Sequence, residues 1–127
     1  MVNSRNKGKA GELELAHELT RLLGVDARRG QQFSGSPDSP DVRTNLPGLH
    51  IECKRVERFN LYDALAQSAR DAGPDEIPIV CHRRNRTKWV VIVELDRLTD
   101  LANLLERHLQ KRRIVPPDHG RKSQGAG

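Results

Sequence analysis

The stretch LPGLHIECKRV, residues 46–56, joins a proline–glycine turn to a short apolar run that two charged residues interrupt. Glu52 and Lys54 lie on either side of Cys53. Because alternate side chains of a strand share a face, Glu52 and Lys54 point to one side, whereas Cys53 and the aliphatic residues point to the other. The stretch therefore predicts a strand with one core face and one face that carries a charge pair.

Outward from this strand, the pattern predicts a mixed β-sheet flanked by helices. Leucines recur at helical spacing in several segments, and segments rich in Gly, Pro or Ser separate the elements. The strands at 41–45 and 49–56 form a hairpin around the proline–glycine turn. This order describes an α/β fold. The predicted elements are helix 7–23, strands 25–29, 41–45 and 49–56, helix 61–72, strands 77–82 and 88–95, and helix 96–111.

The length of the chain suits one domain with a modest core, since it has 127 residues. We expect this domain to span residues 1–111. Residues 112–127, RRIVPPDHGRKSQGAG, are basic and rich in Pro and Gly, which predicts a disordered tail.

The charge of the chain favours a polyanionic partner. Lys and Arg number 22 against 17 Asp and Glu, so the net charge is +5. Nucleic acid is the commonest partner of such a domain, and the alternative is a protein that is merely basic. There is no apolar run near 18 residues, so no membrane span is predicted. Two cysteines in apolar surroundings, Cys53 and Cys81, suit reduced thiols and hence the cytoplasm.

Glu12 occupies an unusual position in the first helix. On a helical wheel it falls in the centre of the apolar stripe, whereas Glu14 and Glu18 fall on the polar face. A charge on the core side is costly unless something pairs with it. Two interpretations remain: Glu12 sits at the rim, helped by the positive helix N-terminus, or a cation or basic group lies beneath it.

Asp41 is predicted to complete a group of carboxylates. It opens the strand that precedes Glu52 by one hairpin, so the two residues are expected on neighbouring strands. Asp38, in the loop before it, competes for the same role. A site with carboxylates and no imidazole or thiolate suits Mg²⁺, with Mn²⁺ as an alternative. With Lys54 beside such a metal, the charged face of the strand is predicted to hydrolyse phosphodiesters.

These residues resemble a known nuclease signature. The order Asp41, Glu52, Lys54 resembles the PD-(D/E)xK signature of nucleases with the restriction-endonuclease-like fold. More narrowly, KGKAGELELAHELTRLLG at 7–24 and SGSPDSPDV at 34–42, with HIECK in the strand, resemble Holliday junction resolvases of archaeal type and their phage counterparts.

The resemblance covers about residues 5–98, and it implies a Mg²⁺-dependent DNA endonuclease that acts as a homodimer on branched or duplex DNA. It also implies a bacterial or phage-infected host cell. In the family, the residue between Glu and Lys is usually aliphatic, and Cys53 departs mildly from that. Some members carry a glutamine on the following helix, where Gln67 stands here; a surface glutamine is the alternative.

The predicted site residues form three groups. The catalytic residues are Glu12, Asp41, Glu52, Lys54 and Gln67. The metal ligands are Glu12, Asp41, Glu52 and Cys53. The DNA-binding residues are Lys7, Lys9, Arg28, Arg29, Ser34, Arg55 and Arg58, which suit contacts with backbone phosphates.

Three functions remain open at this point. The first is a metal-dependent endonuclease, with a junction resolvase as its specific form. The second is a repair or restriction-type nicking nuclease of the same fold. The third is a basic DNA-binding module without catalysis, which the position of Glu12 disfavours.

Overall fold

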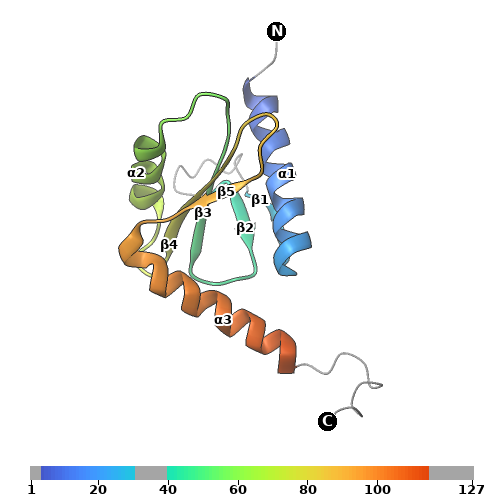
Figure 1. The fold of residues 1–127 in the computed structure, drawn as a ribbon, viewed down its shortest axis with the longest axis vertical. Helices are drawn as coiled ribbons and strands as arrows, with labels where there is room; N and C mark the ends of the chain where they lie inside the picture. Colours follow the sequence, from blue (N-terminus) through green and yellow to red (C-terminus); the bar gives the residue numbers. More distant parts are fainter. Residues whose placement is uncertain (1–3, 31–39, 115–127) are drawn as a thin grey trace.

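The computed structural model describes residues 4–30 and 40–114, with side chains from residue 8 to 111 within those ranges (Figure 1). The elements are α1 (Ser4–Leu23), β1 (Ala27–Arg29), β2 (Val42–Thr44), β3 (Leu49–Arg55), α2 (Leu61–Asp71), β4 (Ile77–Arg83), β5 (Val90–Ile92), the 3₁₀ helix η2 (Leu95–Arg97) and α3 (Leu98–Ile114). Of the predicted tail 112–127, residues 112–114 form the end of α3, and residues 115–127 lie outside the described residues. A domain end at 111 stays a prediction.

The strands form one mixed sheet in the order β1-β2-β3-β4-β5. β3 and β4 are parallel, and the other neighbouring pairs are antiparallel. β2 and β3 make the expected hairpin, with Val42 opposite Ile51. The parallel pair needs a crossover, which α2 supplies between β3 and β4. The predicted α/β fold with a mixed sheet and flanking helices is confirmed.

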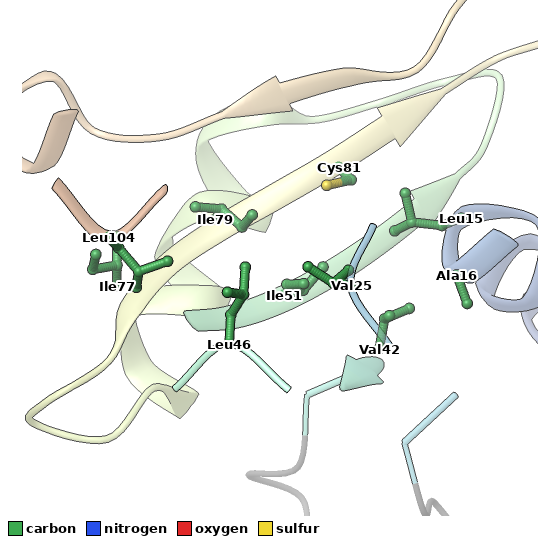
Figure 2. Close-up of a cluster of buried hydrophobic side chains, with 10 residues drawn as sticks. All are labelled: Leu15, Ala16, Val25, Val42, Leu46, Ile51, Ile77, Ile79, Cys81 and Leu104. Atoms are coloured by element: carbon green, nitrogen blue, oxygen red, sulfur yellow. The ribbon is translucent and has the colours of Figure 1, made fainter. Parts of the chain in front are cut away.

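The main core lies between α1 and the sheet and is aliphatic (Figure 2). Leu15 and Ala16 of α1 pack there with Val42 of β2 and Ile51 of β3. A second, smaller cluster lies on the opposite face, where Ala64 and Leu65 of α2 meet Val80 of β4, and these three form its buried part. The sheet is therefore covered by α1 on one face and α2 on the other (Figure 1).

The ends of α2 agree with the sequence pattern. Asn60 caps the helix, since its side chain accepts a hydrogen bond from the Asp63 N–H at 3.1 Å. The helix ends at Asp71, just before the Gly73-Pro74 pair. This cap fixes where the chain leaves β3 and turns onto the α2 face of the sheet.

The leucine spacing of the last predicted helix puts Leu98, Leu101, Leu105 and Leu109 on one apolar stripe, and the structure agrees with this stripe only in its middle. Leu104, which the prediction left out, is the buried residue, and Leu101 and Leu105 pack partly against the core. Leu98 and Leu109, at the ends of the predicted stripe, are 48% and 40% exposed. The reason is that only the middle of α3 reaches the sheet, whereas its ends project past it (Figure 1).

Within the described residues, no helix has both the length and the apolar character that a membrane crossing requires.

Candidate active site

The register of the β2–β3 hairpin brings Asp41 opposite Glu52. Since Val42 pairs with Ile51 and both point into the main core, their neighbours Asp41 and Glu52 point to the other face. The Asp41 N–H donates to the Ile51 carbonyl at 3.0 Å. The Cys53 N–H donates to Asp41 Oδ2 at 2.9 Å, which orients the Asp41 carboxylate.

The Asp41 and Glu52 carboxyls lie on neighbouring strands, close enough for the charge of Glu52 to act on Asp41. Burial, followed by the charge of Glu52, raises the pKa of Asp41 to about 7, although the Cys53 N–H opposes this. The charge of Glu12 adds to the same effect. Glu52 itself is 3% exposed. Two oxygen ligands held together at such an electrostatic cost fit a hard divalent cation, which would replace the proton.

Glu12 has a basic partner, as one of its two interpretations required. Arg29 Nε donates to Glu12 Oε1 at 2.9 Å, and both side chains are mostly buried. No group of three or more His, Cys, Asp or Glu residues in the described ranges is arranged to hold a metal ion. Glu12 thus lies near the Asp41–Glu52 pair but does not join it as a third ligand in this arrangement.

Gly11 explains how α1 comes this close to the sheet. A Cβ atom at this position would lie 2.6 Å from the Cβ atom of Arg55 in β3. The absence of a side chain at Gly11 therefore permits the contact that sets the depth of Glu12, its neighbour in sequence.

Lys54 and Gln67 meet on the α2 face of the sheet. Lys54 Nζ donates to Gln67 Oε1 over 3.4 Å, a long hydrogen bond. Both side chains are half-buried, so Gln67 is not the freely exposed glutamine that we considered as an alternative. Lys54 follows Glu52 on the same face of β3, as predicted from the alternation.

The predicted core stripe of α2 was right at Leu65 and wrong elsewhere, and the difference explains the position of Gln67. The predicted stripe was Leu61, Leu65, Ala69 and Ala72. The buried residues are Ala64, Leu65 and Ser68. Ser68 Oγ donates to the Ile79 carbonyl of β4 at 3.1 Å, so a polar residue occupies the centre of the contact. This rotates α2 relative to the prediction and turns Gln67 toward Lys54.

His50 is a site residue that the sequence analysis missed. It is fully buried, and its Nε2 lies 3.0 Å from Glu52 Oε2. Its Nδ1 lies 3.5 Å from Glu76 Oε1 and has no hydrogen-bond partner among the described residues. Burial alone would lower the pKa of His50, but the hydrogen bond to Glu52 and the nearby carboxylates raise it above its usual value. The alternation His50, Glu52, Lys54 along one strand face was the available signal.

Cys53 differs from the other predicted metal ligands. Its side chain packs with the main core on the α1 face, opposite the carboxylates. Burial raises the pKa of its thiol well above the usual range. Only the main-chain N–H of Cys53 contacts Asp41, so the thiol does not lie with the predicted ligands.

Comparison with known proteins assigns the family. Residues 3–116 match the model of a family described as "Phage putative PDDEXK endonuclease". The chain belongs to this PDDEXK endonuclease family. No curated protein matches the chain. Among solved structures, the chain is similar to Hjc of Archaeoglobus fulgidus, a Holliday junction resolvase from an archaeal hyperthermophile. The identity is 26%, the TM-score 0.52, and the match covers 68% of this chain and 72% of that one.

Several predicted DNA-binding arginines of this PDDEXK endonuclease are ion-paired within the chain. Arg28 lies 3.1 Å from Asp26, and Arg29 is the partner of Glu12. Arg55 donates to Glu14 at 3.1 Å and thereby ties β3 to α1. Lys9 and Arg58 are exposed. Lys7 lies in α1 without a described side chain, and Ser34 and Asp38 lie outside the described residues.

Glu14, which the helical wheel places on the polar face of the first helix, is also ion-paired. It pairs with Arg55 of β3 and with Arg83 at the end of β4. The Arg55 guanidinium also reaches the side chain of Asn85 in the following turn. Glu14 therefore joins α1 to two strands, which the helical wheel could not show.

Proposed function

We propose that this PDDEXK endonuclease hydrolyses phosphodiester bonds of branched DNA with the help of Mg²⁺ or Mn²⁺, and that a Holliday junction is its preferred substrate. The observation that carries this proposal is the Asp41–Glu52 pair, with Lys54 two residues along the same strand face. The similarity to an archaeal resolvase supports the choice of substrate.

Asp41 and Glu52 are the proposed metal ligands. When bound, the cation neutralises the scissile phosphate and polarises its bonds. Asp41 must lose its proton to bind, and the Cys53 N–H keeps its carboxylate turned toward Glu52. His50 holds the second oxygen of Glu52, so that Glu52 keeps one orientation.

Lys54 is the proposed residue that orients the attacking water and stabilises the charge that develops on the phosphate. Gln67 accepts a hydrogen bond from Lys54 Nζ and limits the positions that the ammonium can take. Glu12 remains a proposed member of the site. It would have to exchange Arg29 for the metal or its water shell when DNA arrives.

A homodimer is part of the proposal, because a four-way junction requires two symmetric cuts and a two-fold axis presents the same site to two strands. An apolar surface is available for it. Val91 of the edge strand β5, Leu95 of η2 and Leu98 of α3 are 55%, 84% and 48% exposed. Sedimentation equilibrium should give about twice the 14.3 kDa chain mass. A monomer both free and on junction DNA would exclude paired cleavage.

We place the protein in the cytoplasm of a bacterial or phage-infected host cell. Cys53 and Cys81 are free thiols, which is usual for a reducing compartment.

A cleavage assay on four DNA forms tests this function. A four-way junction, a fork, a duplex and a single strand are compared in Mg²⁺, in Mn²⁺ and in EDTA. We expect paired cuts in the junction and no cleavage in EDTA. Preferred nicking of the fork or duplex would favour a repair or restriction-type nuclease instead. Binding without cleavage in either metal would leave a DNA-binding module.

A further inference from the structure

A cavity of about 430 Å³ lies at the end of β4 that carries His82 and has no role in the function proposed above. Phe59 and His82 line it, together with Arg84, Thr87 and Lys88. Its volume falls within the range of about 300–1,000 Å³ that is common for small-ligand sites.

The register of the parallel strands places this cavity next to Lys54. Lys54 of β3 pairs with His82 of β4, so their side chains share the α2 face at adjacent positions. Neighbouring strands lie about 4.8 Å apart. The cavity therefore begins one strand away from Lys54, toward the carboxyl ends of β3 and β4.

One wall of the cavity is aromatic. The rings of Phe59 and His82 stack with centroids 3.9 Å apart and planes 11° from parallel. His82 is fixed by a contact of 3.0 Å between its Nε2 and the Val56 carbonyl. The two rings cover each other's inner faces, so the outer face of this fixed stack is the one that suits contact with a nucleobase, because every base has a π-face.

Two cations stand at the rim. Arg84 and Lys88 are exposed, and Glu57, the acidic residue of the lining, is already bound to the Asn85 N–H at 2.8 Å. The turn that carries Arg84 is held by its own hydrogen bonds, including Thr87 N–H to the Arg84 carbonyl at 3.3 Å. Arg84 is thus presented on an ordered turn.

We propose that this cavity is a nucleotide subsite that binds the unstacked nucleotide at the branch point, beside the phosphate that is cut. Its base contacts the Phe59–His82 wall and its phosphate contacts Arg84 and Lys88. This inference rests on the proposed nuclease function. A base inside a continuous duplex is stacked and cannot reach such a wall, whereas a branch point offers bases that unstack at small cost. The subsite therefore favours branched over continuous DNA.

The test uses the full chain and a four-way junction that carries 2-aminopurine at the branch point, with Ca²⁺ in place of Mg²⁺. The subsite variant is Arg84→Gln with Lys88→Gln. The matched control is Arg107→Gln with Lys111→Gln. Arg107 and Lys111 are exposed on α3, and their substitution removes the same amount of positive charge as the subsite variant does. Arg107 lies near Gly48 and Ile77, where β3 and β4 begin, whereas the proposed subsite lies toward their carboxyl ends.

We expect the subsite variant to bind the junction about tenfold more weakly. The slope of log affinity against log salt concentration should become shallower by about one to two, since the variant loses one or two phosphate contacts. The control should bind more tightly than the subsite variant and keep a steeper slope. Phe59→Leu should reduce the fluorescence change of 2-aminopurine and keep the wild-type salt slope, and Phe59→Tyr should restore the change. Thermal melting of Phe59→Leu shows whether it is folded.

The outcomes separate the two proposals. If the subsite variant and the control bind alike, the subsite is wrong, and junction cleavage by the wild type in Mg²⁺ still supports the nuclease. If the wild type binds through the subsite but cuts no DNA in Mg²⁺ or Mn²⁺, the nuclease proposal fails and the subsite stands. A wild type that does not bind the junction overturns both.

Discussion

The two faces of β3 differ in what their buried side chains can do. On the α1 face, Ile51 joins an aliphatic core that only needs to exclude water. On the α2 face, His50 is fully buried and Glu52 is 3% exposed. Burying a polar group costs free energy unless it is hydrogen-bonded, and burying a charge can cost more than its partner returns. One strand therefore carries stability on one side and the proposed chemistry on the other.

The largest expected effect is on cleavage, which substitutions on the α2 face of β3 should reduce and a substitution on the α1 face should not. Asp41→Asn, Glu52→Gln and Lys54→Ala should each reduce single-turnover cleavage of a four-way junction by about 10²-fold or more, because each removes a charged group at the phosphate. Ile51→Val, on the core face, should cleave at the wild-type rate. It should lose about 0.5–1.5 kcal/mol of unfolding free energy in urea. If Ile51→Val lost as much activity as Glu52→Gln, the assignment of catalysis to one face of β3 alone would be wrong.

A second prediction concerns His50, which supports Glu52 from the same face. His50→Leu should weaken Mn²⁺ binding, measured by calorimetry, by about 10- to 100-fold, because Glu52 loses the group that orients it. His50→Gln keeps a donor and should recover part of this affinity. His50 has a structural role alone if both variants bind Mn²⁺ as the wild type does.

The third prediction uses the raised pKa of Asp41 in the metal-free protein. Between about pH 4 and 7 the unfolded chain has Asp41 ionised, whereas the folded chain keeps it protonated. The folded state then binds more protons, so the Asp41 contribution makes the unfolding free energy fall as pH rises through this window. Asp41→Asn should flatten that fall in urea titrations at pH 4, 5.5 and 7. An unchanged slope would place Asp41 outside the buried pair.

Gln67 should have the smallest effect. Gln67→Ala removes the long hydrogen bond to Lys54 Nζ and leaves Lys54 in place, so cleavage should fall only a few-fold. Arg70→Ala, on the exposed side of the same helix, is the matched control and should not change the rate. A loss at Gln67 as large as that at Lys54 would show that Gln67 touches the reacting phosphate itself.

Local alternation was enough to predict the charged face of β3. It also placed Asp41 beside Glu52, because a short hairpin brings neighbouring strands into register. What it could not predict were contacts set by tertiary packing. Arg29 meets Glu12 across 17 residues, and Ser68 occupies the buried centre of α2, where it donates to a β4 carbonyl. Neither contact can be predicted from helix or strand periodicity in the sequence.

The sequence also understated the role of polar residues in packing. His50 stands in an apolar run, where an imidazole could equally be a satisfied core residue, and only the 3.0 Å contact to Glu52 links it to the site. Leu104 was missed because several leucines of α3 fit a stripe equally well. Which of them reaches the sheet depends on the angle of the helix.

Calorimetry of Mn²⁺ binding at pH 6.5 tests the Asp41–Glu52 metal site most directly. The measurement is repeated in buffers of different ionisation enthalpy to count released protons. Because Asp41 holds a proton near neutral pH, the wild type should bind Mn²⁺ and release about one proton per metal. Asp41→Asn should release fewer protons per metal than the wild type and bind more weakly. Mn²⁺ binding of equal strength and proton count in both proteins would contradict the claim that Asp41 and Glu52 form the metal site.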